Sequence, residues 1–136
     1  MSEVYEVPDG YYYTKDHEWI IAKGSYYLVG ITDYAAKMLN DIVYVNLPEQ
    51  GAVLSSGQVF GQVESVKTVS DVYMPVTGKI LKINSMLTQT PELVTNASYT
   101  DGWMLEIESN SFSEESTRLL NAKAYSDYIS NLKSHE

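Results

Sequence analysis

Cysteine is absent from the 136 residues of this chain. Its absence excludes disulfide bonds, thiolate zinc sites, iron–sulfur clusters and a cysteine nucleophile, and it agrees with a reducing compartment. Positive charge is also scarce, because 9 Lys and Arg residues stand against 18 Asp and Glu residues, for a net charge of −9 at pH 7. Nucleic-acid grooves and anionic membranes require clustered Lys and Arg, so we expect neither partner.

Long hydrophobic runs are absent as well. No apolar stretch approaches the roughly 20 residues of a membrane-spanning helix. The first ten residues, MSEVYEVPDG, have neither the apolar segment of a secretory signal nor the Arg-rich composition of a transit peptide. The sequence therefore predicts a cytoplasmic protein of a prokaryote. A mitochondrial matrix location would require a transit peptide that is missing from this chain.

The composition is that of a globular chain, with 44% hydrophobic and 20% charged residues. The length fits one domain, which can bury about two-thirds of its unfolded surface. We divide the chain into an N-terminal extension, residues 1–10, and a single domain, residues 11–136.

Short β-type stretches separated by Gly and Pro dominate the sequence. Glu18–Ala22 and Tyr26–Ile31 flank a short loop that contains Gly24, which predicts a hairpin. The other expected strands are Ile42–Val45, Val59–Glu64, Val69–Tyr73, Lys79–Ile83 and Trp103–Glu108. This pattern favours a mainly β fold, a small sandwich or flattened barrel.

Two helices are expected beside the strands. A short internal helix, Tyr34–Leu39, follows the candidate caps Thr32 and Asp33. Near the C-terminus, Ser111 with a glutamate three residues later resembles a capping box, and apolar residues then recur four apart. We therefore expect one C-terminal helix over about residues 112–133.

Lys67 is the leading candidate for chemistry. It lies between two β-type stretches, which predict a hairpin whose tip is near Val66 and Lys67. A lysine at such a tip presents its amine to a modifying enzyme. The alternative is an ordinary solvated lysine, since exposed lysines are common in turns.

The segment around this lysine, ESVKTVSD, resembles the lipoyl-attachment motif of the glycine cleavage system H-protein family. Other segments similar to that family follow in its order and at its spacing: YTKDHEW (13–19), VGITDYA (29–35), DIVYVNLPEQG (41–51), PVTGKI (75–80), PELV (91–94) and DGW (101–103). A biotin carrier usually has Met on both sides of its lysine, whereas Val66 and Thr68 stand here. The resemblance covers residues 11–130.

The resemblance implies a lipoyl/biotinyl-type hybrid of two small antiparallel sheets, with the short internal helix and the C-terminal helix added. It also implies one covalently bound lipoate per chain, as N6-lipoyllysine at Lys67. The matching attachment motif comprises Glu64, Ser65, Val66 and Asp71.

The resemblance further implies a carrier with no catalytic residue of its own. Such a carrier would shuttle the aminomethyl group of glycine from a pyridoxal-phosphate-dependent glycine decarboxylase (P protein) to a tetrahydrofolate-dependent aminomethyltransferase (T protein). Dihydrolipoamide dehydrogenase (L protein) would reoxidise the arm. A lipoate ligase or a lipoyl or octanoyl transferase would attach it. We expect the free carrier to be a monomer.

A cleft that shelters the loaded arm is implied as well. The positions that match this cleft are Glu18 and Asp71, with His17 close by and Asp16 as a further candidate. Carboxylates could hold a protonated amine by charge-assisted hydrogen bonds.

Two alternatives remain open. A lipoate-relay protein of the same family would donate lipoyl groups to 2-oxoacid dehydrogenase subunits. A stand-alone enzyme would use Glu18, Asp71 or His17 as acid–base groups. No metal site is expected, because His17 and Glu18 have neither an HExxH motif nor a third ligand around them.

Three positions depart from the family pattern. Asn40 stands where the family usually has Gly, and Asn tolerates the left-handed backbone conformation. Thr95 and Ser98 replace the usual Asn and Pro after PELV, so we expect a different loop shape there.

Overall fold

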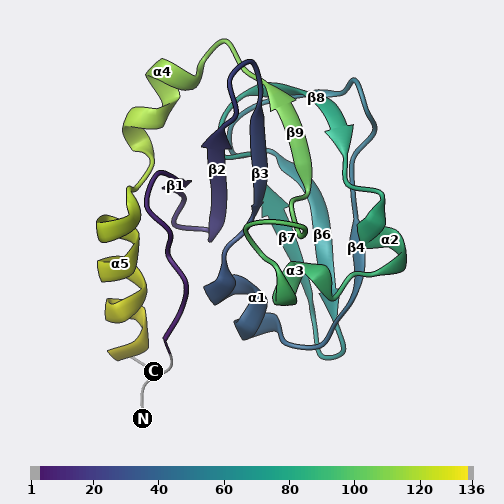
Figure 1. The fold of residues 1–136 in the computed structure, drawn as a ribbon, viewed down its shortest axis with the longest axis vertical. Helices are drawn as coiled ribbons and strands as arrows, with labels where there is room; N and C mark the ends of the chain where they lie inside the picture. Colours follow the sequence, from purple (N-terminus) through teal and green to yellow (C-terminus); the bar gives the residue numbers. More distant parts are fainter. Residues whose placement is uncertain (1–3, 135–136) are drawn as a thin grey trace.

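The computed structural model describes residues 4–134 and contains two antiparallel sheets with a common core (Figure 1). Over these residues the larger sheet has the order β1-β2-β3-β9-β8-β5, formed by β1 (Tyr12–Tyr13), β2 (Glu18–Ala22), β3 (Tyr27–Ile31), β9 (Leu105–Glu108), β8 (Gly78–Ile83) and β5 (Val53–Leu54). The smaller sheet has the order β4-β6-β7, formed by β4 (Ile42–Asn46), β6 (Val59–Ser65) and β7 (Val69–Tyr73). The predicted mainly β fold is confirmed.

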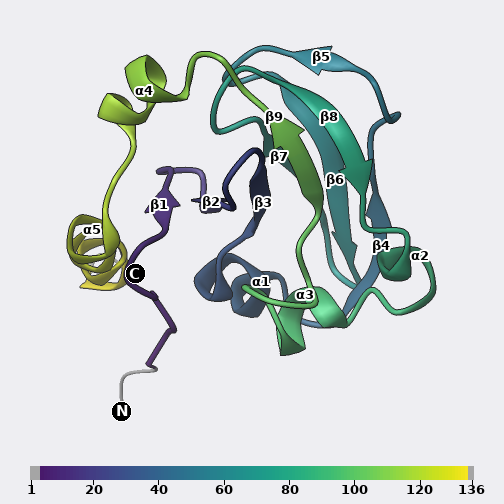
Figure 2. The same ribbon diagram turned by 45° about the horizontal axis from the view of Figure 1, so that its top comes forward.

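Short helices follow several of the strands: α1 (Asp33–Leu39), α2 (Met86–Gln89), α3 (Leu93–Asn96), α4 (Phe112–Glu115) and the 3-10 turn η1 (Ser116–Arg118). The longer helix α5 (Ala122–Ser134) is the last element. The elements β1, β5, α2 and α3 are not predicted by the sequence, because two to four residues are too few to display a period. Both α4 and α5 lie on the side of β1 and β2, away from the smaller sheet (Figure 2).

The predicted internal helix is confirmed as α1. Thr32 is its N-cap, and the Thr32 Oγ1 accepts a hydrogen bond from the Ala35 N–H at 3.2 Å. The helix ends at Asn40, which adopts a φ of 55° and donates its N–H to the Ala36 carbonyl. Asn therefore supplies the left-handed end that Gly would otherwise provide.

The main core lies between the two sheets. Ile20, Val29 and Ile107 of the larger sheet are fully buried and belong to the same cluster as Val63 and Val72 of the smaller sheet. Burying one such side chain stabilises a fold by about 1.5–3 kcal/mol. This shared core fixes the smaller sheet, and with it the β6–β7 hairpin, on the rest of the domain.

The predicted C-terminal helix is confirmed as α5, but its predicted extent, one unbroken helix over about residues 112–133, is wrong. The chain becomes extended at Leu119 (ψ 159°), and Leu120 forms a β-bridge with Tyr13 through two N–H···O bonds of 2.8 Å. Leu119 packs against the main core, whereas Leu120 packs against a second, aromatic cluster. Extended backbone points successive side chains in opposite directions, so packing these two partly buried leucines against different clusters breaks the helix.

The predicted capping box is also wrong. Ser111 makes no side-chain hydrogen bond at the start of α4. The next glutamate after the predicted one, Glu115, has a different role: its carboxylate accepts hydrogen bonds from the Thr77 N–H (2.7 Å) and the Thr77 hydroxyl (2.8 Å). The longer helix α5 begins after Asn121, whose Oδ1 accepts from the Ala124 N–H at 2.9 Å. The cap signal therefore belongs ten residues further along the chain.

An aromatic cluster holds α5 against the domain. Tyr13 of β1 and Tyr125 of α5 are fully buried, and their rings stack at 4.7 Å between centroids. Trp19, Tyr34 and Ile129 complete the buried part of this cluster. Aromatic pairs of this kind contribute about 0.5–1.5 kcal/mol beyond the area they bury.

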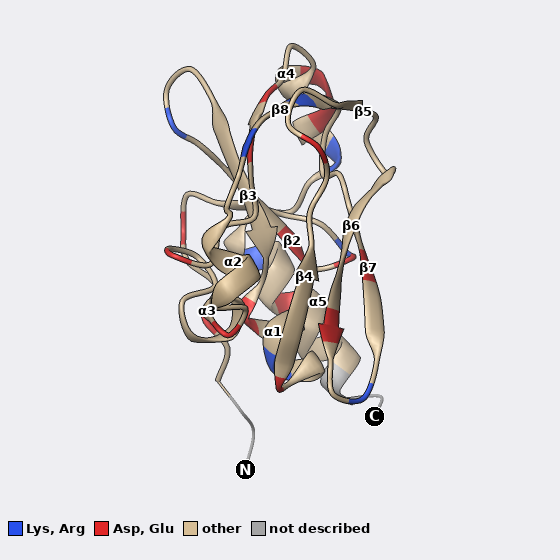
Figure 3. Ribbon diagram, turned by 90° about the vertical axis from the view of Figure 1, so that its right-hand side faces the viewer, with Lys and Arg blue, Asp and Glu red and all other residues tan. Residues whose placement is uncertain are grey.

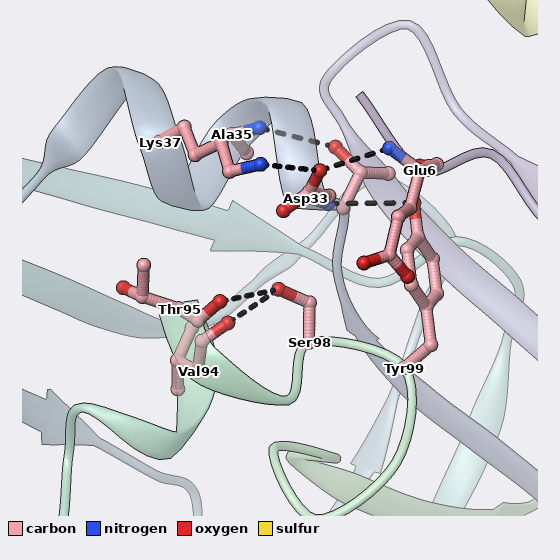
Figure 4. Close-up of polar contacts among 9 residues, drawn as sticks. Glu6, Asp33, Ala35, Lys37, Val94, Thr95, Ser98 and Tyr99 are labelled. Atoms are coloured by element: carbon pink, nitrogen blue, oxygen red, sulfur yellow. Dashed lines mark hydrogen bonds and ion pairs between the residues drawn. The ribbon is translucent and has the colours of Figure 1, made fainter. Parts of the chain in front are cut away.

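The N-terminal segment packs on α1 through the buried Asp33 (Figure 4). The Asp33 carboxylate accepts from the Glu6 N–H at 2.9 Å and pairs with Lys37 at 3.1 Å. The Tyr99 hydroxyl donates to the Glu6 carbonyl at 2.9 Å, and the ring of Tyr5 lies edge-on to Tyr34 at 5.0 Å. Residues 4–10 are thus attached to the domain by both polar and aromatic contacts.

The loop that departs from the family pattern contains α3. The Ser98 hydroxyl donates to the Val94 carbonyl at 2.6 Å, which closes the last turn (Figure 4). The Ser98 carbonyl accepts from the Trp19 indole N–H at 3.0 Å. Ser98 therefore joins this loop to β2.

Candidate functional site

Lys67 lies in the turn of the β6–β7 hairpin, as the sequence predicts. The Ser65 N–H donates to the Thr68 carbonyl at 2.8 Å, which leaves Val66 and Lys67 as the two loop residues. Both are exposed, and 75% of the Val66 surface is accessible. In Figure 3 this turn, with a basic position on it, forms one end of the hairpin.

The Lys67 amine is available for acylation. Among residues 4–132, whose side chains are described, no carboxylate lies within ion-pair distance of it. Forming an amide requires an exposed amine with open space around it, and a hairpin tip provides both. The residues present therefore fit a lipoyl group.

Other residues of the motif have different surroundings. Glu64 is partly buried on β6 opposite Val69, and Ser65 is buried at the end of the strand. Asp71 is exposed on β7, where its carboxylate accepts from the Gln62 amide at 3.3 Å. Neighbouring side chains on a strand face opposite ways, so Asp71 lies on the face opposite the buried Val72.

Glu18 is a buried acid between the two sheets. Its carboxylate accepts hydrogen bonds from the Thr14 hydroxyl and from the Tyr73 N–H, the latter at 3.2 Å. Burial raises the pKa of Glu18 to about 7, although the two hydrogen bonds act in the opposite direction. Glu18 thus joins the start of β2 to the end of β7 and titrates near neutrality.

His17 adopts a left-handed conformation with a φ of 72°. Its Nδ1 is 2.8 Å from the Tyr125 hydroxyl, which is 2.7 Å from the Thr32 hydroxyl. Burial lowers the pKa of His17, so the neutral ring is favoured. In the part of the chain that the structure describes, no group of three or more His, Cys, Asp or Glu residues could hold a metal ion.

Two surface clefts meet at Asp16. One has a volume of about 230 Å³ and is lined by Asp16, His17, Tyr34, Met38 and Ser70, among others. The other has a volume of about 240 Å³ and is lined by residues that include Asp16, Glu18, Tyr73 and Arg118. Only Asp16 borders both of these clefts.

The structure therefore brings three of the four candidate cleft residues together. Asp16, His17 and Glu18 border the two clefts, whereas Asp71 lines neither. Ser70 of β7 lines the same cleft as His17, and the sequence did not predict it. The alternation of side chains along β7 could have indicated it, because this alternation places Ser70 on the same, inward face as Val72.

The smaller of the two clefts lies close to the hairpin in sequence and in space. Ser70 is three residues beyond Lys67 on β7, and Tyr34 and Met38 come from α1. The loop after α1 contacts the turn directly, because the Val66 N–H donates to the Asp41 carbonyl at 3.2 Å. Lys67 and this cleft are thus neighbours.

Comparison with known proteins extends the resemblance over nearly the whole chain. The sequence model of the family described as "Glycine cleavage H-protein" matches residues 11–132. The Pyrococcus furiosus protein named "Probable glycine cleavage system H protein" is 44% identical over 135 residues, 97% of this chain and 100% of that protein. The glycine cleavage system H protein of Thermus thermophilus is 44% identical over 124 residues, 91% of this chain and 96% of that protein.

This chain belongs to the glycine cleavage H-protein family.

The fold of the H-protein family agrees with the structure. The crystal structure of a glycine cleavage system H protein from Mycobacterium marinum superposes with a TM-score of 0.80 at 37% sequence identity. The match covers 93% of this chain and 99% of that one. The family consists of lipoyl carriers, and the matched residues include Lys67 and both clefts. In the described residues, no helix is long and apolar enough to cross a membrane.

Proposed function

We propose that Lys67 of this H-protein is the lipoyl-bearing residue. The chain then acts as the non-catalytic carrier of the glycine cleavage system, with one lipoate in amide linkage. It receives the aminomethyl group of glycine from glycine decarboxylase and delivers it to the aminomethyltransferase. Dihydrolipoamide dehydrogenase takes the electrons.

The observation that carries this proposal is an exposed lysine on a hairpin tip in a chain of the H-protein family. When bound, lipoate supplies a disulfide that accepts electrons and the carbon cargo. The protein supplies a tether, and a tether raises the effective concentration of the reactive end at each partner.

The cleft beside α1 supports a second part of the proposal. It lies next to the hairpin, and Asp16 and His17 are at its border. A primary ammonium brought there would meet the Asp16 carboxylate, and the buried Glu18 lines the adjoining cleft. We propose that these residues hold the cargo end of the arm between visits to the partner enzymes.

The carrier assignment is tested with Lys67→Arg. Arginine keeps the positive charge at an exposed turn, so stability should stay within about 0.5 kcal/mol, but it cannot form the amide. In protein from its native source, we expect the intact mass to show one lipoyl group and peptide mapping to locate it on Lys67. The Arg variant should lack it and fail to support glycine decarboxylation with purified partner enzymes.

Each failure has a distinct meaning. Lipoylation of another lysine in the Arg variant, with carriage retained, would refute the site. A lipoylated wild-type protein that passes lipoyl groups to a 2-oxoacid dehydrogenase subunit but supports no glycine decarboxylation would refute the carrier function. In that case the assignment of Lys67 would stand.

A further inference from the structure

The chain presents two exposed lysines at two-residue hairpin turns. In the β2–β3 hairpin the Lys23 N–H donates to the Tyr26 carbonyl at 2.8 Å. In the β6–β7 hairpin the Ser65 N–H donates to the Thr68 carbonyl at the same distance. Lys23 immediately precedes its two loop residues, Gly24 and Ser25, whereas Lys67 is itself a loop residue. Both lysines are exposed at a tight turn, so exposure and turn length alone do not distinguish them.

The turn around Lys67 differs because a buried hydroxyl organises it. Ser65 is only 6% exposed. Its Oγ accepts from the Lys67 N–H at 3.3 Å and from the Thr68 N–H at 3.2 Å, and it donates to the Thr68 carbonyl at 3.3 Å. A hydroxyl has one donor and two acceptor positions, so all of its hydrogen-bonding capacity is used within this turn.

A second element contacts the same turn from outside the hairpin. The Asp41 carbonyl, on the loop between α1 and β4, accepts from the Val66 N–H at 3.2 Å. Asn40 and Asp41 are both in the positive-φ region, at 55° and 32°. This unusual backbone aims the Asp41 carbonyl at the turn.

The amides of Val66, Lys67 and Thr68 thus all have protein acceptors. The β2–β3 turn has no equivalent, because in the described residues no hydrogen bond is found for the Gly24 or Ser25 amide. Gly24 also has a φ of 81°, a region in which glycine is freest. The β6–β7 turn is therefore tied to protein acceptors at three amides, whereas the two loop amides of the β2–β3 turn have no such partners among the described residues.

We propose that Ser65 is a positioning residue for lipoylation: with the Asp41 carbonyl, it fixes the turn backbone so that the attaching enzyme selects Lys67. This inference rests on the proposed function. A turn that already has its bound conformation loses less conformational entropy when an enzyme binds it. The lysine amine is then aligned with the acyl donor. Selection of Lys67 over Lys23 follows from this difference.

The test uses unmodified full-length protein, a lipoate ligase, lipoate and ATP. In the transfer step Nζ bonds to the carbonyl carbon of lipoyl-adenylate, AMP leaves, and the lysine ammonium loses two protons. The decisive pair is Ser65→Thr and Ser65→Val, because the two side chains have the same shape and only Thr keeps the hydroxyl. Ser25→Ala, in the other hairpin, is the matched serine control.

Three quantities are measured: kcat/KM for modification of Lys67, the modified fraction of Lys23 by peptide mapping, and amide hydrogen exchange at the turn. Losing one net hydrogen bond corresponds to about a fivefold change. We expect Ser65→Val to lower kcat/KM at least about fivefold and to speed exchange of the Lys67 and Thr68 amides similarly. Ser65→Thr should stay near wild type, and Ser25→Ala should match it.

Equal kcat/KM for Ser65→Val and Ser65→Thr would overturn the positioning role, as would unchanged exchange at Lys67 and Thr68 in Ser65→Val. Wild-type protein that is modified elsewhere, or not at all, would instead refute the proposed function. The two failures are therefore separable in one set of reactions.

Discussion

At the scale of single residues, the candidate site is defined by where each acid lies. Glu18 is 1% exposed and hydrogen-bonded to Thr14 and Tyr73, so its first role is to join the sheets. Asp16 is exposed and borders both clefts. Asp71 is exposed beside Gln62 on the opposite face of β7.

These positions predict how the acids affect the loaded carrier. A charge-assisted hydrogen bond contributes on the order of 1.5–3 kcal/mol, so Asp16→Asn should speed loss of the cargo roughly tenfold or more. Asp71→Asn should change it less than about fivefold, because Asp71 lines neither cleft and an exposed charge outside the site interacts weakly with the cargo. The measurement is release of ammonia and formaldehyde from purified loaded carrier, without partner enzymes.

Asp127→Asn, on the exposed surface of α5, is the control and should behave as wild type. Lipoylation of Lys67 should be normal in every variant. Equal release rates for Asp16→Asn and wild type would remove Asp16 from the site, and a larger effect of Asp71→Asn would move the cargo to the other face of β7.

At the scale of elements, the loops position the candidate site as much as the helices and strands do. The loop after α1 contacts the β6–β7 turn through Asp41, and α1 itself lines the cleft through Tyr34 and Met38. The N-terminal segment in turn packs on α1 through Asp33 and Tyr5. Residues far from Lys67 in sequence therefore determine the position of α1, which lines the cleft near this lysine.

Removing residues 1–10 should consequently destabilise α1. The lost contacts include a hydrogen bond to the buried Asp33 carboxylate and the Tyr5–Tyr34 ring contact, so the free energy of unfolding should fall by roughly 2 kcal/mol. Amides of α1 should exchange faster. Urea unfolding and hydrogen exchange measure these effects.

The matched control is Val4→Ala, because Val4 is 88% exposed and a surface change of this kind stays within about 0.5 kcal/mol. An unfolding midpoint for the shortened chain that equals that of the full chain would show that the segment contributes nothing to α1.

At the scale of the whole molecule, Glu18 makes stability depend on pH. Burial raises the pKa of folded Glu18 from 4.5 to about 7. Between these values the folded state binds the proton more tightly than the unfolded state does, so the free energy of unfolding falls as pH rises. His17 acts in the opposite direction, since its pKa is lowered and stability falls as the pH drops below its unfolded value of 6.5.

Glu18→Gln should abolish the first of these dependences. The amide fits the same partners, because its oxygen can accept from Tyr73 and its NH₂ group can donate to the Thr14 hydroxyl. Relative to this variant, the wild-type protein should lose on the order of 3 kcal/mol between pH 4.5 and pH 7. Denaturant unfolding across that range measures the difference, and parallel pH curves for the two proteins would contradict it.

The sequence alone predicts much of the fold and the position of Lys67. The β2–β3 and β6–β7 hairpins, α1 and its ends at Thr32 and Asn40 follow from local signals, namely strand alternation, a turn glycine and a helix cap. These signals depend on neighbours along the chain, so they can be read without a structure.

Tertiary structure decided the rest. The break at Leu119 and Leu120 exists because two adjacent, partly buried leucines pack against different clusters. No local sequence pattern indicates which cluster each leucine contacts. The surroundings of Glu18 and Asp16 likewise depend on β7 and α1, which are distant in sequence. Burial and the pKa values that follow from it belong to the packed molecule, because only packing removes water from a charged group.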